Sequence, residues 1–295
     1  MEVERCQWLM RKALNYFLLS PALLISLLIV FIPGLLTIIV SFTDWNGVST
    51  TPEFIGLQNF NELFVDSIFW QALFNNVKWT LIFITIPIVI GLLTAMLLLK
   101  RKRTKSVYQL IFLFPYILAP TTNAILWLNI IFNPVSGVVG YLQEAGIPID
   151  SPLSSMNTAL YAVAAVDVWH YWGFLTVVFL AALRQTPLDQ IEAAHLEGCN
   201  GWQLFRYVYF PTIKPTFNIL FIMIIIFSFL TFDYVYLLTG GGPSHATEML
   251  STYAYTFAFS AFQVGKAAAI ALFMSFFGLL ASCFYIWMSR NELKN

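Results

Sequence analysis

Six long apolar runs alternate with polar stretches along the chain. They cover approximately residues 16–42, 77–99, 107–132, 158–183, 217–238 and 267–288. A helix rises about 1.5 Å per residue, so each run can cross the roughly 30 Å of hydrocarbon in a bilayer. The runs are continuously apolar rather than alternating, and a backbone exposed to lipid must satisfy its own hydrogen bonds. The pattern therefore predicts an all-α membrane protein with six transmembrane helices.

The first run has a second interpretation, because Arg11 and Lys12 precede it as basic residues precede the apolar region of a signal peptide. The run is too long for such a region, and no A-x-A-like cleavage site follows before Asp44. We therefore interpret it as the first span, with cleavage as the alternative.

Charge is distributed very unevenly between the loops. With six spans, 13 of the 15 Lys and Arg residues lie on one side, and the other two, Lys78 and Lys266, lie at span edges. Basic loops stay in the cytoplasm, so both termini are predicted to be cytoplasmic and the protein to be a multi-pass protein of the inner (plasma) membrane.

Composition agrees with a membrane protein and excludes several chemistries. Hydrophobic residues make up 59% of the chain and charged residues 10%, where a soluble domain carries about 25%. The three Cys and three His residues are scattered without metal-ligand spacing, so neither a disulfide framework nor a metal site is expected.

The loops differ in character. Residues 43–76 form a long polar external stretch that is expected to pack against something outside the membrane. Residues 133–157 are rich in Gly and Pro and are predicted to form a short, partly helical excursion. Gly240-Gly-Gly-Pro243 predicts a turn at the start of a third external loop.

The cytoplasmic stretch 186–211 predicts a helical elbow. Thr186 can cap a helix, Pro187 fits its first position and Gly198 suits a left-handed helix stop. Residues 202–209 would then form a second short helix that ends at Pro211.

One face of the first elbow helix is suited to a close protein contact. Glu192 supplies an acidic group, and Ala193 and Ala194 favour helix while adding little bulk. This surface can serve as a docking site for a cytoplasmic partner. The alternative is a structured linker, because a Glu-Ala-Ala tripeptide also arises by chance in helices.

The elbow resembles the coupling loop of binding-protein-dependent ABC importer permeases, whose pattern is E-A-A-x3-G-x9-[I/V]-x-L-P. The matching residues are Glu192, Ala193, Ala194, Gly198, Val208 and Pro211. Flanking segments resemble the carbohydrate-uptake branch, related to maltose and glycerol-phosphate permeases: Phe179-Leu-Ala-Ala-Leu183, Phe205-Arg206, Pro211-x3-Pro215 and Thr239-Gly-Gly-Gly-Pro-Ser-His-Ala-Thr247. Two departures are Glu197-Gly198-Cys199, where the family usually has Asp-Gly-Ala, and Phe210, where it usually has Leu.

The resemblance implies a type I ABC importer fold over residues 71–290, preceded by an N-terminal segment, 1–70, with the first span and an external loop. It implies that the helix over 187–196 lies in a groove of an ATP-hydrolysing subunit, so that Glu192, Ala193, Ala194, Gly198 and Pro211 couple ATP hydrolysis to movement of the spans. The implied partners are a second homologous permease, two ATPase subunits and a periplasmic or lipid-anchored binding protein; no nucleic acid is expected.

The chain itself is not expected to be an enzyme or to hold a cofactor. It lacks a G-x-x-x-x-G-K-[ST] loop, because Gly265-Lys266 has Ser260 and Ala267 at the other required positions. ATP and Mg are therefore expected to bind to the partner subunits.

Two carboxylates within spans are the main candidates for the solute pathway. Asp167 and Asp233 each cost roughly 2.5–3.5 kcal/mol to insert, so each defaults to a functional hypothesis. Each has aromatic neighbours that could stack on sugar rings while the carboxylates accept hydroxyl hydrogen bonds; these neighbours are Trp169, Phe229 and Tyr234, and Asn123 is a weaker polar candidate. The alternative is structural, because Trp and Tyr concentrate at membrane interfaces and either Asp can pair with a neighbouring helix.

Two other classes of function fit the sequence less well. A stand-alone secondary transporter or channel favours internal repeats and coupled ion sites, and the sequence shows no repeat. A membrane-embedded enzyme needs a paired carboxylate, a His cluster or a nucleophile, and none is visible. The sequence leaves the solute open among oligosaccharides, polyols, glycosylated osmolytes and glycerol phosphates.

Overall fold

Helices form nearly all the regular structure of the computed structural model, which describes residues 16–101 and 104–292. Within these residues, five helices are long and apolar enough to cross a membrane: Tyr16–Val40, Ser67–Leu99, Ala159–Leu183, Gly201–Leu230 and Val264–Trp287. A sixth candidate is the pair Ser106–Ile117 and Pro120–Ile131, which is bent by 93°. With this pair counted as one span, the six predicted spans are confirmed.

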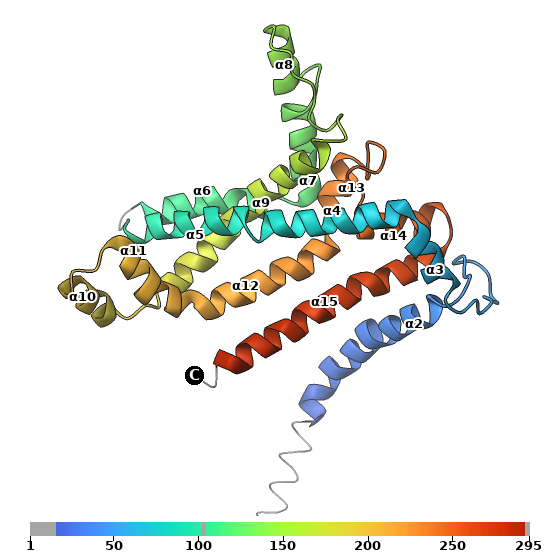
Figure 1. The fold of residues 1–295 in the computed structure, drawn as a ribbon, viewed down its shortest axis with the longest axis horizontal. Helices are drawn as coiled ribbons and strands as arrows, with labels where there is room; N and C mark the ends of the chain where they lie inside the picture. The colour runs from blue at the N-terminus through green and yellow to red at the C-terminus, as the bar shows by residue number, and fades with distance from the viewer. Residues whose placement is uncertain (1–15, 102–103, 293–295) are drawn as a thin grey trace, which may run out of the picture.

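The bundle is built around α9 (Ala159–Leu183), on which α5 (Ile86–Leu99) and α6 (Lys105–Ile117) pack lengthwise. α12 (Phe210–Leu230) contacts α9 on one side and α15 (Val264–Glu292) on the other. Figure 1 shows these helices running in similar directions, with α10 at one end of the bundle and α3 at the other. The continuous apolar surface of α9 fits this central place, since 14 of its 25 residues are buried.

Two glycines allow the central helices to approach closely. A Cβ atom on Gly173 of α9 would lie 1.7 Å from the carbonyl oxygen of Phe112 in α6. A Cβ atom on Gly91 of α5 would lie 2.9 Å from the Cβ atom of Leu175 in α9. Small residues at such crossings are how membrane helices gain packing contacts.

The second span begins earlier than its apolar run. The expected polar loop 43–76 contains α3 (Gln58–Val65) and the first turns of α4 (Ser67–Phe83), so helix replaces loop there. Asp66 explains the start of α4, because its Oδ1 accepts a hydrogen bond from the Ile68 backbone N–H (2.9 Å). The helix of the second span is interrupted between α4 and α5, just before Pro87, which occupies the first turn of α5.

The third span is not the continuous helix that its apolar run predicts. α6 ends at Ile117, Leu118 and Ala119 are extended, and α7 (Pro120–Leu126) starts in a new direction. A proline disfavours helical backbone in the residue before it, so Pro120 accounts for the bend. Pro115, in contrast, lies inside α6.

The fifth span is displaced towards the N-terminus relative to the predicted 217–238. Helix runs from α11 (Gly201–Leu204) through α12 to Leu230, and α13 (Asp233–Leu238) is a separate short helix. The Thr231 carbonyl oxygen accepts a hydrogen bond from the Ser251 hydroxyl, which replaces an intrahelical partner at this break. Asp233 therefore begins α13 instead of lying within a continuous span.

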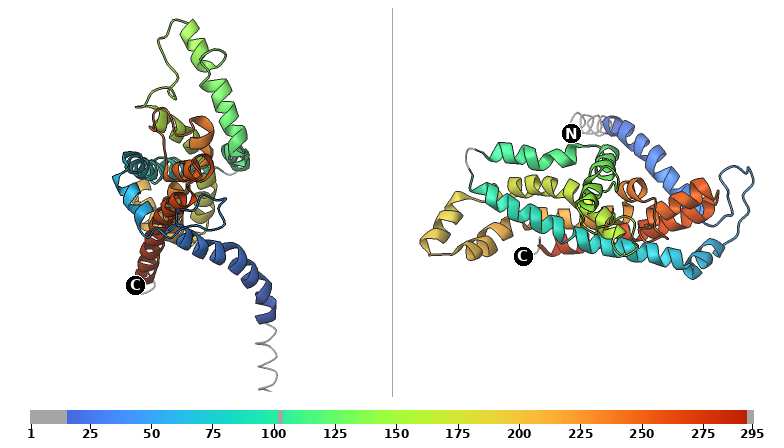
Figure 2. Two further views of the ribbon diagram at one scale, coloured as in Figure 1. Left: turned by 90° about the vertical axis from the view of Figure 1, so that its right-hand side faces the viewer. Right: turned by 90° about the horizontal axis from the view of Figure 1, so that it is seen from above.

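Two elements extend away from the bundle on opposite sides. α7 continues into an arm that ends in α8 (Val138–Glu144), the helical part of the predicted excursion, and α2 (Ile32–Val40) leans away on the other side (Figure 2). α10 (Leu188–Leu196) and α14 (Leu250–Tyr255) are two further short α-helices, and described residues 16–26 are also α-helical. Four π-helical stretches adjoin the α-helices: Leu27–Phe31, Trp127–Ile131, Phe205–Tyr209 and Thr256–Ser260.

Candidate functional site

The first candidate site is the elbow between α9 and α12. α10 begins after Pro187, which is its N-cap, so the predicted cap at Thr186 is wrong. The Thr186 hydroxyl is buried and has no hydrogen-bond partner among the described residues. Pro187 holds an extended backbone (φ −60°, ψ 135°) and so sets the direction in which the helix starts.

The stop signal at Gly198 is confirmed. Its φ is +76°, in the left-handed region. The Gly198 N–H donates to the His195 carbonyl oxygen (3.1 Å) and the Cys199 N–H to the Ala194 carbonyl oxygen (3.0 Å). These two bonds form a Schellman motif, which closes the C-terminus of α10 and turns the chain sharply towards α11.

The second half of the elbow differs from the prediction. α11 starts at a reciprocal capping box: the Gln203 N–H donates to Asn200 Oδ1 and the Asn200 N–H to Gln203 Oε1, both at 2.9 Å. Helix then continues through Pro211 instead of ending there. The π-helical stretch Phe205–Tyr209 precedes Pro211, and its wider turn accommodates a residue that has no N–H to donate.

The elbow presents an exposed surface of mixed character. Glu192 and Ala193 are exposed, whereas Ala194 is buried against the elbow itself. Leu188 and Leu196 are 74% and 90% exposed. They lie in the elbow, outside the apolar spans, where exposed leucines are a sign of a protein contact. A partner surface that covers α10 would bury these leucines next to the Glu192 carboxylate.

The second candidate site is a cavity of about 240 Å³ between α9, α12 and the break before α13. α4, α6 and α7 also contribute to its wall. Of the predicted pathway residues, the cavity brings together Asp167, Asp233 and Tyr234. Half of the remaining lining residues are Phe, Tyr or Trp: Trp79, Phe83, Tyr116, Tyr171, Phe227 and Phe232.

Asp167 and His170 lie on the same face of α9, one turn apart. His170 Nδ1 is 3.7 Å from Asp167 Oδ1, which is beyond hydrogen-bond distance. The His170 ring is also close to two tyrosine rings, with centroid distances of 5.2 Å to Tyr116 and 5.5 Å to Tyr234. The ring therefore lies between aromatic walls, and its nitrogens have no hydrogen-bond partner among the described residues.

Asn123 acts behind the cavity wall. It is fully buried, and its Nδ2 donates to the hydroxyl of Tyr234 (2.8 Å), which lines the cavity. This bond fixes α7 to α13 at the point where both helices have just changed direction. Asn123 therefore positions Tyr234.

Phe229 and Trp169 lie outside this cavity. Phe229 stacks on Phe277 of α15 with a centroid distance of 4.6 Å. Trp169 contacts Trp127 and faces a hollow between α5 and α9 that is otherwise mostly apolar. Successive helical residues turn by about 100°, so Trp169 faces nearly opposite to Asp167.

Several lining residues were missed by the sequence analysis. His170 follows Asp167 by three residues, a spacing that shares a helix face and could have identified it. Tyr116 and Thr231 join the cavity because α6 and α12 break beside them. Pro120 is a sequence signal for the first break, whereas no local pattern predicts the second.

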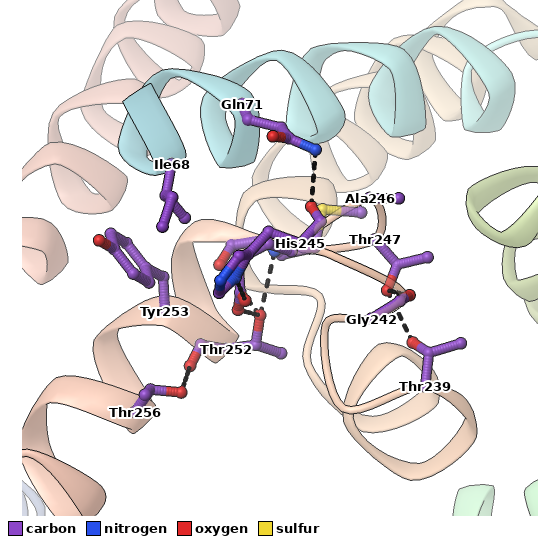
Figure 3. A network of polar contacts seen from close by, with 12 residues as sticks. Ile68, Gln71, Thr239, Gly242, His245, Ala246, Thr247, Thr252, Tyr253 and Thr256 are labelled. Atoms are coloured by element: carbon purple, nitrogen blue, oxygen red, sulfur yellow. Dashed lines mark hydrogen bonds and ion pairs between the residues drawn. The ribbon is translucent and has the colours of Figure 1, made fainter. Parts of the chain in front are cut away.

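The external loop after α13 is held by a polar network (Figure 3). The predicted turn is present, with Gly240 and Gly241 both at positive φ. Glu248 is 4% exposed, and its carboxylate contacts His245 Nδ1 (2.9 Å) and accepts from the Thr252 hydroxyl (2.6 Å). Gln71 of α4 donates to the His245 carbonyl oxygen (2.9 Å), so the loop is tied to the second span.

Comparison with known proteins decides the family. Residues 87–292 match the family described as "Binding-protein-dependent transport system inner membrane component". A probable ABC transporter permease of Pyrococcus horikoshii is 31% identical over 279 residues, which cover 93% of this chain and 95% of the relative. The chain belongs to this permease family. The permease is thus a transport subunit of a binding-protein-dependent ABC importer and a multi-pass protein of the inner membrane.

Other relatives of the permease have names that refer to solutes. A probable starch degradation products transport system permease of Thermoanaerobacterium thermosulfurigenes is 34% identical over 88% of both chains. An sn-glycerol-3-phosphate transport system permease of Agrobacterium fabrum is 30% identical over 88% of both chains. In a crystal structure of a bacterial ABC transporter that imports alginate, one chain shares the fold, with a TM-score of 0.85 at 22% identity over 98% of the permease and 99% of that chain.

Proposed function

We propose that the permease translocates a carbohydrate or carbohydrate-like solute that an extracytoplasmic binding protein delivers. The observation that carries the proposal is the cavity beside the α12–α13 break, in which aromatic rings surround Asp167 and Asp233. Aromatic faces pack against the C–H faces of sugar rings, and carboxylates accept hydrogen bonds from their hydroxyls. The names of the starch-product and glycerol-phosphate relatives support the same class of solute.

The elbow supplies the contact for the energy source. In this proposal, α10 docks on an ATP-hydrolysing subunit, which binds ATP and Mg and covers Leu188, Glu192, Ala193 and Leu196. Gly198 and the Schellman motif keep α10 at a fixed angle to α11. Because α11 continues into α12 as one helix, a displacement of the elbow is transmitted along the helix to the cavity wall. Pro211 lies on this path.

The complete importer in this proposal contains a second homologous permease and two ATPase subunits. Asp233 is exposed in the isolated chain although it lies beside membrane-spanning helices. A carboxylate in that position needs protein or water around it, and a second permease facing the cavity would enclose it. Rocking of the two permeases would then open the enclosed cavity to one side of the membrane at a time.

The test is to reconstitute the purified importer in liposomes with its binding protein. We expect uptake of a radiolabelled neutral oligosaccharide such as maltotriose to require ATP inside the vesicles, and the ATPase subunits to copurify with the permease. Uptake at full rate by the permease alone, without ATP, would contradict the proposal.

A further inference from the structure

The charge of the cavity wall is one-sided. Asp167 and Asp233 line the cavity, and no Lys or Arg is among the described residues that line it. Lys78 is adjacent to the lining residue Trp79 in sequence but is exposed and does not line the cavity. Lys266 lies at the outer end of the bundle, 3.3 Å from the Glu62 carboxylate. The wall that this chain contributes therefore carries two carboxyl groups and the His170 imidazole, and no described Lys or Arg side chain faces an anion there.

A second, independent feature marks this cavity as a polar binding site. His170 is 8% exposed, lines the cavity, and its Nε2 has no hydrogen-bond partner among the described residues. Buried polar side chains are normally satisfied, so an orphaned imidazole nitrogen at a cavity wall marks a place for a ligand or water hydrogen bond. A neutral hydroxyl suits this position because it can donate or accept, whichever tautomer the ring adopts.

The surroundings of the cavity make the free energy of solute binding depend on the sign of the solute's charge. Aromatic walls offer few polar groups to replace the water around an ion, so an uncompensated anion in such surroundings bears a desolvation penalty that a close cation would offset. A phosphate or uronate group here would face two carboxyl groups and an aromatic wall. A hydroxyl or ammonium group would find acceptors at Asp167 and Asp233.

We propose that this cavity selects against anionic solutes, so that the permease translocates neutral or amine-bearing polyhydroxylated solutes and not phosphate esters or acidic sugars. The inference rests on the proposed function, since it assigns the charge class of the solute that passes the same cavity. It separates this permease from family members whose names refer to glycerol phosphate.

The test measures the electrostatic potential of the cavity by thiol modification. Cys6, Cys199 and Cys283 are replaced by Ser, and Thr231→Cys introduces a single thiol at the cavity wall of the purified importer. Its rates of reaction with trimethylammonium-ethyl methanethiosulfonate and with sulfonatoethyl methanethiosulfonate are compared at low ionic strength. The ratio of the cationic reagent's rate to the anionic reagent's rate is also measured for Ser136→Cys, an exposed loop position outside the cavity.

We expect the cation-to-anion rate ratio at Thr231→Cys to exceed the Ser136→Cys ratio by at least about tenfold, because a cleft lined by one sign of charge concentrates the opposite charge. Asp233→Asn and Asp167→Asn should each lower the ratio, whereas Asp150→Asn, in the distant arm, should leave it unchanged. An equal or smaller ratio at Thr231→Cys would overturn the proposal. Phe227→Cys provides a second lining position if Thr231→Cys does not fold.

Protection by solutes connects the potential to selectivity. Millimolar maltotriose should slow modification of Thr231→Cys by the cationic reagent severalfold, whereas glucose 6-phosphate at the same concentration should not. Protection by glucose 6-phosphate equal to that by maltotriose would overturn the charge selection. These readouts need no ATP, so loss of ATP-driven uptake would contradict the proposed function without affecting them.

Discussion

At the scale of single residues, two glycines serve different physical needs. Gly198 occupies the left-handed region (φ +76°), and nothing lies within 4 Å of the position where its Cβ atom would be. Gly173 has ordinary helical backbone, but a Cβ atom there would lie 1.7 Å from the Phe112 carbonyl oxygen. The first glycine is required by backbone conformation and the second by the approach of another helix.

Gly198→Ala should loosen the elbow without disturbing the bundle. A left-handed alanine costs about 1 kcal/mol, so amides at the C-terminus of α10 should exchange roughly fivefold faster. Solute-stimulated ATP hydrolysis should fall while membrane insertion stays normal. Gly201→Ala is the matched control, because Gly201 also has open space around it but not a positive φ. Equal hydrolysis by the two variants would contradict the role given to the turn.

Gly173→Ala should act on the bundle instead. Its methyl group would force α6 away from α9, and overpacking of this kind costs about 1–3 kcal/mol or more. We expect a lower melting temperature in detergent, measured by tryptophan fluorescence. Gly278→Ala in α15 has nothing within 4 Å of the added carbon and should leave the melting temperature unchanged or slightly raised. A normal melting temperature for Gly173→Ala would show that the crossing is looser than described.

At the scale of elements, buried amides join helices that are distant in sequence. Asn76 of α4 is fully buried; its Nδ2 donates to the Ser228 carbonyl oxygen (2.8 Å) and its Oδ1 accepts from the Leu250 N–H (3.0 Å). One side chain thus connects the second span to α12 and to the start of α14. These connections hold the external loop beside the wall of the cavity.

Asn76→Ala should therefore destabilise the junction of α4, α12 and α14. The substitution leaves a buried carbonyl and a buried N–H without partners, at a cost of about 1–3 kcal/mol. We expect a lower melting temperature and faster cleavage of the 239–249 loop by an external protease. Asn129→Ala removes an exposed amide that bonds within its own helix and is expected to show neither change.

At the scale of the whole molecule, the elbow and the 43–57 loop lie at opposite ends of the bundle (Figure 1). The Lys and Arg distribution assigns the elbow end to the cytoplasm. The arm formed by α7 and α8 stands across the direction of the other helices, so within the third span α6 alone runs parallel to them. The orientation of the permease in the membrane can be tested with one probe at each end of the bundle.

Single cysteines in a cysteine-free background should report these two ends. Thr50→Cys, in the exposed loop before α3, should react with a membrane-impermeant maleimide in intact cells. Glu197→Cys, exposed in the elbow, should react only after the cells are permeabilised. Labelling of the elbow in intact cells would place it outside and remove the basis for ATPase coupling.

The sequence by itself determined the class of fold, the number of spans and the Gly198 turn. These features depend on local quantities: the length of an apolar run, the sign of loop charge and the conformational freedom of one residue. The family membership was likewise readable from the Glu192 to Pro211 pattern. The division at residue 70 and the roles of the elbow residues stay predictions.

Only the tertiary structure decided which polar residues share a cavity. Asp167 and Asp233 are 66 positions apart, and they meet because α12 ends at Leu230 and the chain turns into α13. Phe229 and Trp169 also have aromatic neighbours in sequence, but Phe229 packs on α15 and Trp169 faces α5. The direction of a side chain depends on where each helix breaks and which neighbouring helix it meets. A continuous apolar run in the sequence indicates neither the position of the break nor the neighbour.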